Sequence, residues 1–296
     1  MAAGAIMEAY KIRNLFRGTL TPNLLLRGQT AVVTGAAGLL GREHSHALAE
    51  AGADLILVDT DTTAINEFRE ELLAEFPERQ LLASDQSVSD KEGVSRLLSE
   101  TLTNGLEPRI LVNNAALDAK VPHQGAGSTP NSLEEFSIDQ WNHEIAVGLT
   151  GALICCQVFG GWMAKHGGGV IVNIASDLSV IAPDQRLYVD ACDNGKSSRS
   201  MYKPVSYPVV KTGLLGLTRY LATYWAQQGI RVNALSPGSV QADQDEGFIE
   251  RLQERIPMAR MASRSEYRGA IVFLCSQLSS YMTGQNLVID GGRSIW

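Results

Sequence analysis

The sequence has little of what marks a membrane protein, a secreted protein or a nucleic-acid-binding protein. It carries 25 Lys and Arg against 32 Asp and Glu, a formal net charge of -7, and no long basic run. A surface for nucleic acid or for an anionic membrane is therefore not expected. The N-terminal residues lack the apolar core of a signal peptide, and no later segment reads as long enough to span a bilayer. We expect a cytoplasmic protein whose partner is a small molecule, with no nucleic-acid or membrane partner.

Cysteine is scarce as well, and its positions follow no ligand or disulfide spacing. Two cysteines are adjacent in the chain, and the other two stand alone. Because disulfide frameworks and zinc sites need paired spacings, we expect no metal site and a reducing compartment. The four are Cys155, Cys156, Cys192 and Cys275.

Short apolar and β-branched runs alternate with longer amphipathic runs along nearly the whole chain. Such alternation favours parallel strands joined by right-handed crossovers, with helices on both faces of the sheet. The sequence therefore predicts an α/β fold, a single-domain doubly wound parallel sheet in three α/β/α layers. The expected strands are 30–34, 54–59, 80–84, 109–114, 169–176, 230–236 and 286–290, and the expected helices are 40–51, 62–76, 89–103, 139–165, 208–228 and 264–278.

A glycine-rich turn, TGAAGLLG, follows the first expected strand and opens the first expected helix. Gly35, Gly38 and Gly41 recur in it at every third position. Glycines there let the backbone approach a pyrophosphate and let helix and strand pack closely, while the first N–H groups of the helix face the anion. The turn, with Leu39 and Leu40 in it, indicates the dinucleotide site of a Rossmann fold, although a tight turn without a ligand is an alternative.

Asp59 ends the second expected strand, eighteen residues after Gly41. A carboxylate at that point can accept hydrogen bonds from the adenosine ribose hydroxyls and would repel a 2′-phosphate, which favours NAD over NADP. Asp59 could instead only cap the following helix, although Asp61 could serve as that cap. Arg42 complicates the preference, and we expect it to face solvent or the pyrophosphate.

The stretch YPVVK places a phenol and an amine four residues apart at the start of an expected helix. Residues four apart share a helix face, so Tyr207 and Lys211 can reach the same ligand. A protonated Lys211 would stabilise the phenolate of Tyr207, which could then act as a general acid or base. Pro208 is tolerated because the first helical turn needs no N–H donor. Taken alone, such a pair is more often accidental.

In its order of motifs the chain resembles the short-chain dehydrogenase/reductase family, from about residue 24 to residue 296. Besides TGAAGLLG and YPVVK, the similar stretches are NNAA at 113–116, NIAS at 173–176 and NALSPGSV at 233–240. Asp85 matches the position where the family contacts adenine. Each stretch alone is weak, and the asparagines of NNAA could merely satisfy loop backbone, but together they are highly specific.

The resemblance implies Ser176, Tyr207 and Lys211 as the catalytic residues. Ser176 would polarise a substrate carbonyl or orient an alcohol, and Lys211 would also bond the nicotinamide ribose. The implied cofactor is NAD, with NADP less expected. The implied cofactor-binding residues are Gly35, Gly38, Leu39, Leu40, Gly41, Asp59, Asp85, Gln86, Asn114, Ala115, Ala116, Tyr207, Lys211, Pro237, Gly238 and Val240.

Two departures from the family pattern bear on the chemistry. The family's catalytic asparagine, which bends the long helix and holds a water of the proton relay, falls at Gly148. Glycine still permits a distorted helix and would leave room for a second water. The other departure is an insertion at 183–205, which must lie beside the substrate. This polar segment is either a solvated loop or a lid that recognises a hydroxylated or anionic substrate, such as a sugar or sugar acid.

Other segments carry weaker expectations. Residues 1–22 form an N-terminal extension to a domain at 23–296, and 243–263 is expected to be the family's variable substrate loop. The family usually forms dimers or tetramers through its long helices, so a homodimer or homotetramer through 139–165 and 208–228 is implied. The ending DGGRSIW weakly resembles a branch found with bacterial surface-glycan and flagellin-sugar pathways.

The leading function is an NAD(H)-dependent oxidoreductase that interconverts a secondary alcohol and a ketone on a sugar or sugar-derived substrate. The alternative is a non-catalytic NAD-binding sensor or scaffold, which the glycine at 148 motivates. The glycine spacing also suggests a sugar-nucleotide epimerase or dehydratase, but the C-terminal part is too short for that branch's substrate domain.

Overall fold

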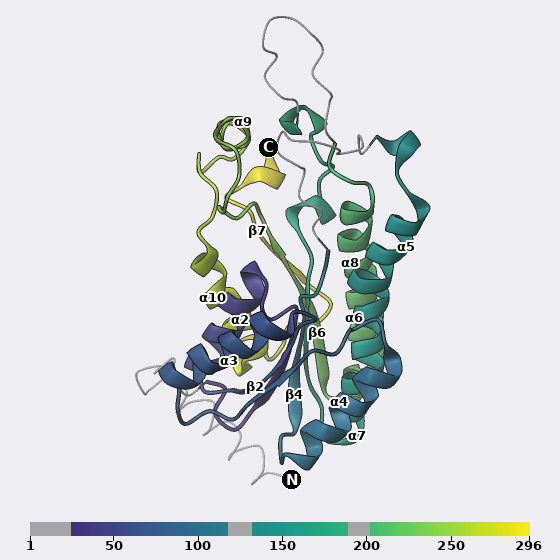
Figure 1. Ribbon diagram of the computed structural model, residues 1–296, viewed down its shortest axis with the longest axis vertical. Coiled ribbons are helices and arrows are strands. Elements are labelled where there is room, and N and C mark those ends of the chain that lie inside the picture. The colour runs from purple at the N-terminus through teal and green to yellow at the C-terminus, as the bar shows by residue number, and fades with distance from the viewer. Residues whose placement is uncertain (1–24, 118–131, 189–201) are drawn as a thin grey trace, which may run out of the picture.

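One sheet of seven parallel strands forms the centre of the protein (Figure 1). The structure, a computed structural model, describes residues 25–117, 132–188 and 202–296. The strand order in this part of the chain is β3-β2-β1-β4-β5-β6-β7, the arrangement of a doubly wound sheet. The strands are β1 (Thr30–Thr34), β2 (Asp54–Val58), β3 (Leu81–Ser84), β4 (Pro108–Asn113), β5 (Gly169–Ile174), β6 (Ile230–Pro237) and β7 (Asn286–Ile289).

Helices cover both faces of this sheet and complete the three layers. They are α2 (Leu39–Glu50), α3 (Thr62–Glu75), α4 (Lys91–Thr103), α5 (Ile138–Ile145), α6 (Gly151–Cys155), α7 (Gly161–Lys165), α8 (Ser206–Tyr224), α9 (Glu246–Gln253) and α10 (Arg268–Cys275). In Figure 1, α2, α3 and α10 lie on one side of the strands, and α4 to α8 lie on the other. Parallel strands require this cover, because their crossovers place helices on both faces.

The sheet divides the core into two apolar layers. Along β1, Ala31 and Val33 belong to one buried cluster and Val32 to the other, because successive side chains of a strand point to opposite faces. The first cluster includes Leu48 of α2, and the second includes Phe159 in the run between α6 and α7. Burial on both faces explains why the strand sequences are apolar throughout rather than alternating.

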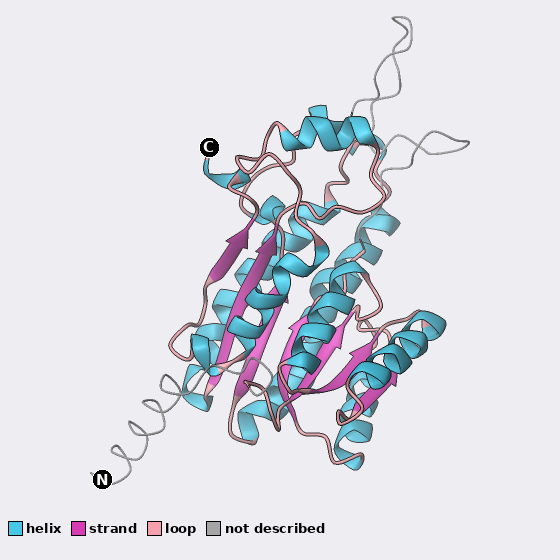
Figure 2. Ribbon diagram, turned by 90° about the vertical axis from the view of Figure 1, so that its left-hand side faces the viewer, coloured by secondary structure: helices cyan, strands magenta, loops and turns pink. Residues whose placement is uncertain are grey.

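The parallel strands end at one edge of the sheet, and the loops that follow them lie together there. β1 pairs with β2 on one side and with β4 on the other. The winding therefore reverses between β1 and β4, and open α/β sheets bind ligands at such a reversal. Figure 2 shows the strands pointing toward the end of the molecule where α9 and the C-terminus lie.

The predicted fold is confirmed, and most element bounds agree with the sequence analysis within two residues. Several details differ. The helix predicted at 208–228 ends at Tyr224, and α10 (Arg268–Cys275) covers only the middle of the helix predicted at 264–278. The strand predicted at 169–176 ends at Ile174, the long helix contains π-helical segments at Ala146–Thr150 and Cys156–Gly160, and α9 lies where a loop is predicted at 243–263. The predicted extension 1–22 lies outside the described residues, as do residues 189–201 of the insertion.

The helical run Ile138–Lys165 is long and apolar enough to cross a membrane, judged by length and composition alone. The sequence prediction that no segment approaches such a length is therefore wrong. In the fold, Cys156, Phe159 and Met163 of this run are buried in the apolar layer that contains Leu111 of β4. The helix of a protein core passes the same test, and the sheet that this run covers accounts for its apolar character.

His44 on α2 generates a prediction about stability in acid. Its side chain is fully buried, and neither ring nitrogen has a hydrogen-bond partner among the described residues. Burial lowers the pKa of His44 to about 4, from an ordinary value of about 6.5. Between those values the unfolded chain binds a proton that the folded chain does not, so stability falls as the pH falls. We expect His44→Leu to remove this pH-dependent loss, which amounts to at most about 3 kcal/mol.

Urea unfolding near neutral pH and again at mildly acid pH measures the effect. The control is His46→Gln on the same helix, because the His46 ring pairs with Glu75 and is partly exposed. This control should retain the loss due to His44. An equal loss in wild type and His44→Leu would show that another group governs acid stability.

Candidate functional site

A cavity of about 1150 Å³ lies at the edge where the strands end. Pockets for one small molecule measure roughly 300–1,000 Å³, so this cavity has room for a dinucleotide and a substrate together. Its wall runs from the turn after β1, past the ends of β2, β4 and β5, to the start of α8 and the segment around α9. The sheet thus places the glycine-rich turn and the YPVVK stretch in one continuous site.

The glycine-rich turn forms one end of the cavity. Gly35 has a φ of 62°, and a Cβ there would lie 2.9 Å from the Cα of Ala115. At Gly41, a Cβ would lie 2.0 Å from the carbonyl oxygen of Gly35, so only glycine allows this close packing of helix and strand. Gly38 precedes α2 without a side-chain cap, so the helix N-terminus is open to an anion. Gly35, Gly38, Leu39 and Leu40 line the cavity, and Gly41 lies behind them.

Asp59 lines the cavity just beyond the end of β2. Its Oδ2 accepts a hydrogen bond from the Ala37 N–H at 3.0 Å, and its Oδ1 accepts one from the Asp61 N–H at 3.1 Å. The cap of α3 is Asp61, whose side chain accepts from the Ala64 N–H. Asp59 therefore does not merely cap the helix. It fixes the glycine-rich turn and presents a carboxylate at the position that a dinucleotide's adenosine ribose would reach.

Of the two positions expected for Arg42, the structure shows the one toward solvent, because its side chain is 35% exposed. Its guanidinium pairs with Glu71 and lies 4.2 Å from the centre of the Phe68 ring, both on α3. Arg42 is not part of the described cavity wall. The arginine consequently joins α2 to α3, and it does not offset the charge of Asp59 within the cavity.

Asp85 also lies outside the cavity wall, although the family resemblance implies contact with adenine. Its carboxylate accepts a hydrogen bond from Thr62 Oγ1 at 3.3 Å, at the start of α3. Gln86 lines the cavity, and so does Ser87, which the sequence analysis misses. Side chains of extended chain alternate in direction, so a shift of one position at the end of β3 exchanges which residue meets the cavity. A serine in a turn gives no distinctive signal.

The asparagines of NNAA play different parts. Asn114 donates from Nδ2 to the carbonyl oxygens of Thr34 and Gly35, each at 3.0 Å, and so ties the end of β4 to the glycine-rich turn. Asn113 is buried and donates to Asn173 Oδ1 at 2.8 Å. The backbone-satisfying interpretation therefore holds for Asn114, which nevertheless borders the cavity. Ala115, Ala116, Pro237, Gly238 and Val240 line the cavity as well.

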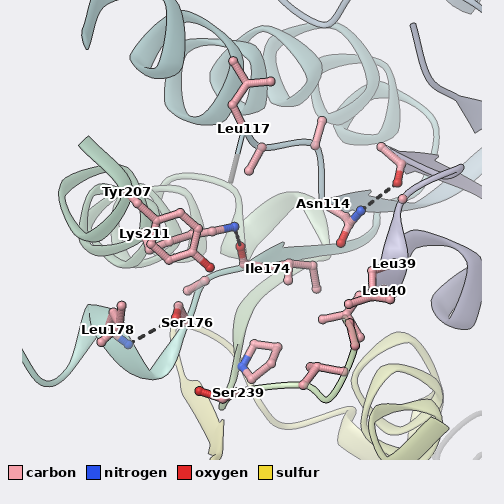
Figure 3. A pocket seen from close by; sticks show the side chains of 18 of the residues that line it. Leu39, Leu40, Asn114, Leu117, Ile174, Ser176, Leu178, Tyr207, Lys211 and Ser239 are labelled. Atoms are coloured by element: carbon pink, nitrogen blue, oxygen red, sulfur yellow. Dashed lines mark hydrogen bonds between the residues drawn. The ribbon is translucent and has the colours of Figure 1, made fainter. Parts of the chain in front are cut away.

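Tyr207 and Lys211 lie one turn apart at the start of α8 and both reach the cavity (Figure 3). The Lys211 ammonium is buried and donates to the carbonyl oxygen of Ile174, at the end of β5, at 2.7 Å. It lies 5.7 Å from the centre of the Tyr207 ring. A second ammonium, that of Lys203, lies 4.1 Å from the same ring centre. Two cations therefore lie near the Tyr207 ring.

Ser176 lies beside Tyr207 in the same view, just beyond the end of β5 (Figure 3). Its hydroxyl accepts from the Leu178 N–H at 3.2 Å and donates to Asp177 Oδ1 at 3.0 Å. The structure thus brings Ser176, Tyr207 and Lys211 together from two separate elements. An alcohol or carbonyl oxygen placed among them would meet a hydroxyl, a phenol and a nearby ammonium.

Two family models match the chain. The model described as short chain dehydrogenase matches residues 29–188, and the model described as Enoyl-(Acyl carrier protein) reductase matches residues 193–294. The first of them spans more than half of the chain. The protein belongs to the short-chain dehydrogenase family.

Individual relatives within this family cover nearly the whole chain. The D-threitol dehydrogenase of Mycolicibacterium smegmatis is 31% identical over 275 residues, which are 91% of this chain and 94% of that protein. The 2-dehydro-3-deoxy-D-gluconate 5-dehydrogenase of Bacillus subtilis is 31% identical over 285 residues, 93% and 98% of the two chains. A crystal structure of a gluconate 5-dehydrogenase from Burkholderia cenocepacia J2315, in complex with NADP and tartrate, has 26% identity and a TM-score of 0.78, covering 93% and 99%.

Gly148, where the family pattern has asparagine, lies inside the π-helical segment Ala146–Thr150. The predicted helix distortion at this glycine is therefore confirmed. The space beside it is not open, however, because a Cβ at 148 would lie 2.6 Å from Cγ1 of Val210. The expectation that glycine leaves room for a second water is wrong on this side, since the valine of YPVVK fills it.

Two segments far apart in the chain contribute apolar side chains to one part of the cavity wall. Leu187, at the start of the insertion, packs with Leu252 of α9, and the Tyr188 ring lies 5.5 Å from that of Phe248. Asp184 holds the two segments together through an ion pair with Arg255 at 2.7 Å. The predicted substrate loop 243–263 and the described start of the insertion thus enclose the cavity jointly.

Asp59 generates a prediction about cofactor choice. Because its carboxylate would repel a 2′-phosphate, the wild-type chain should bind NAD more tightly than NADP. In Asp59→Ser, the dissociation constant for NADP divided by that for NAD should fall by about tenfold or more. Titration of intrinsic fluorescence with each dinucleotide measures the ratio. Asp61→Ser is the matched control, since it makes the same substitution at the cap of α3, where serine can still cap, and it lies outside the described cavity wall. Equal affinities in wild type would contradict the assignment.

Proposed function

We propose that the protein is an NAD(H)-dependent oxidoreductase that interconverts a secondary alcohol and a ketone on a sugar, a polyol or a sugar acid. The observation that carries this proposal is the convergence of Tyr207, Lys211 and Ser176 in the cavity that begins at the glycine-rich turn. A proton-transfer group, a cation that stabilises its ionised form and a hydroxyl donor are what this reaction needs from the protein. The family membership supports an alcohol oxidoreductase.

A nicotinamide dinucleotide, when bound, supplies the hydride acceptor or donor for this chemistry. The turn at Gly35 and Gly38 holds its pyrophosphate, and Asp59 receives the adenosine ribose. In alcohol oxidation, Tyr207 accepts the hydroxyl proton from the substrate oxygen while Ser176 donates a hydrogen bond to that oxygen. In reduction the same phenol returns the proton. Lys211 keeps the phenol readily ionised.

The preference for NAD rests on Asp59 and is part of the proposal. The Burkholderia cenocepacia neighbour was solved with NADP, so the family resemblance alone does not favour either dinucleotide. In this chain the carboxylate at the end of β2 is held by two backbone N–H groups. With Arg42 turned to Glu71, we find no cation on the described cavity wall beside Asp59 that would receive a 2′-phosphate.

The proposed substrate class rests on the relatives and on the charged and polar side chains among those that line the cavity. The relatives named above act, by their names, on threitol and on gluconate-type sugar acids. Hydroxylated substrates need several hydrogen-bonding groups, and the cavity wall includes charged and polar side chains outside the glycine-rich turn. They include His143, Asp177, Lys203, Asp243, Gln244, Asp245 and Arg251. A place in surface-glycan or flagellin-sugar biosynthesis stays a prediction.

We further propose a cytoplasmic homodimer or homotetramer that associates through α5 to α8. Tyr220 and Tyr224 of α8 are stacked on each other and exposed, which suits a partner surface. Cys155 and Cys156, in contrast, face the core, and burial raises the pKa of Cys156 to about 12. These thiols suit a reducing compartment but do not form the predicted association surface.

Tyr207→Phe tests the proposed function directly. The variant should keep NAD affinity within about twofold and lose at least about a hundredfold in kcat, because only the proton-transfer group is removed. Purified protein with NAD is offered a panel of polyols, sugars and sugar acids, and nicotinamide absorbance is followed. Tyr202→Phe, a tyrosine that does not line the described cavity, is the control.

Turnover near the wild-type level in Tyr207→Phe would overturn the assignment. NAD binding without turnover of any compound by the wild-type chain would instead favour the alternative, a non-catalytic NAD-binding protein. Restoration of turnover by Gly148→Asn would then assign the loss to the missing asparagine.

Lys203 generates a separate prediction, because its ammonium lies over the Tyr207 ring. Lys203→Met should slow alcohol oxidation by about tenfold near neutral pH and by less at alkaline pH, where the phenol ionises without help. Lys203→Arg, which keeps a cation, should restore most of the rate. The pH profile of kcat measures this. A change confined to KM for anionic substrates would show that Lys203 binds substrate and does not assist Tyr207.

A further inference from the structure

The C-terminal turn delivers an arginine to the active-site cavity. Asp290 follows β7, and its two carboxylate oxygens accept from the Gly292 N–H at 2.9 Å and from the Ser294 N–H at 2.7 Å. These bonds fix the turn on both sides of Arg293. The Arg293 side chain lines the cavity, at the end that holds Ser176.

Arg293 forms a buried ion pair with Asp177. Its Nη1 lies 2.7 Å from Asp177 Oδ2, and the two side chains are only 8% and 4% exposed. The partners are 116 positions apart in the sequence. Charges are costly to bury, and a buried pair often stabilises a fold no more than apolar residues of the same shape would. Stability alone therefore does not explain why this ion pair lies in the cavity wall.

The second carboxylate oxygen of Asp177 meets the hydroxyl of Ser176. Asp177 Oδ1 accepts from Ser176 Oγ at 3.0 Å and from the Leu178 N–H at 2.9 Å. The Leu178 N–H also lies 3.2 Å from Ser176 Oγ. Arg293 holds one oxygen of the carboxylate, and the other oxygen, together with a backbone N–H, holds the serine. The ion pair and the serine form one connected unit.

We propose that Asp177 and Arg293 are positioning residues, which fix the rotamer of Ser176 and so the place of its Oγ beside the substrate oxygen. This inference rests on the proposed function, in which Ser176 turns its one hydroxyl proton from Asp177 Oδ1 to that oxygen while its Oγ keeps the hydrogen bond from the Leu178 N–H. A serine side chain has three staggered rotamers, and the contacts of Asp177 and Leu178 select one of them. Because the Arg293 cation occupies the other oxygen of Asp177, the carboxylate keeps its direction and its remaining oxygen faces the serine.

Removing only one partner would leave a buried charge unpaired and would destabilise the chain. The test therefore uses two variants without the charges. Asp177→Ala with Arg293→Met removes the ion pair and the acceptor for Ser176. Asp177→Asn with Arg293→Met removes the same charges but keeps a side-chain oxygen that can accept from the serine. Each pair of substitutions is made in the wild-type chain and in the Ser176→Ala chain.

The double variant with Asp177→Ala is called the alanine pair, and the one with Asp177→Asn is called the asparagine pair. We expect the alanine pair to lower kcat by about tenfold or more in the wild-type chain, while the dissociation constant for NAD changes by less than about twofold. The asparagine pair should recover most of that loss. In the Ser176→Ala chain, the alanine pair should lower kcat by less than about twofold, because the group that it positions is already absent. Thermal unfolding of each variant records stability separately. Glu43→Gln, which breaks the Glu43–Arg268 pair away from the cavity, is the control for ion-pair loss.

Equal fold losses in kcat with and without Ser176 would overturn the inference, since the pair would then act independently of the serine. A kcat that follows the unfolding temperature across the variants, Glu43→Gln included, would overturn it as well and would leave a purely structural ion pair. A different result concerns the proposed function itself. If Ser176→Ala alone keeps full kcat, the role of the serine is wrong, whatever the ion pair does.

Discussion

The site depends on one constraint: seven parallel strands end at a common edge of the sheet. Residues far apart in the chain meet there only because neighbouring strands keep their register. Asn114, beyond β4, donates to the carbonyls of Thr34 and Gly35 beyond β1, and Lys211 of α8 donates to the carbonyl of Ile174 at the end of β5. These bonds use backbone atoms that the sheet fixes. A rigid sheet therefore sets the distance between the glycine-rich turn and the side chains of Ser176, Tyr207 and Lys211.

The fold and the main residues of the site were predictable because their signals are local. Buried parallel strands read as short apolar runs, and helices between them have their own periodicity. The residues that mark the glycine-rich turn lie within eight consecutive positions, and those that mark YPVVK lie within five. Helix α9 gave no comparable signal, since it has only eight residues. Its apolar contacts are to Leu187, which the sequence places far away.

Side-chain partners across the fold were not predictable in this way. Arg42 could be placed near the dinucleotide by its position in the chain, yet its guanidinium pairs with Glu71 on another helix. Asp85 follows β3 as the family pattern suggests, but its carboxylate turns to Thr62. Arg293 stands in the last turn, where no motif marks it, and still reaches Asp177. Each outcome depends on which elements pack together, and a single sequence does not state that.

At Gly148 the chain lacks the family's asparagine, and the surrounding structure supplies part of what that asparagine does. In the family pattern, the asparagine bends the helix and holds a water of the proton relay. Here the π-helical segment supplies the bend without it, and Val210 fills the adjacent space. Lys211 donates directly to the carbonyl oxygen of Ile174. Because that carbonyl belongs to the end of β5, the position of Lys211 does not depend on the residue at 148. The sheet edge thus holds Lys211 by a hydrogen bond in which residue 148 takes no part.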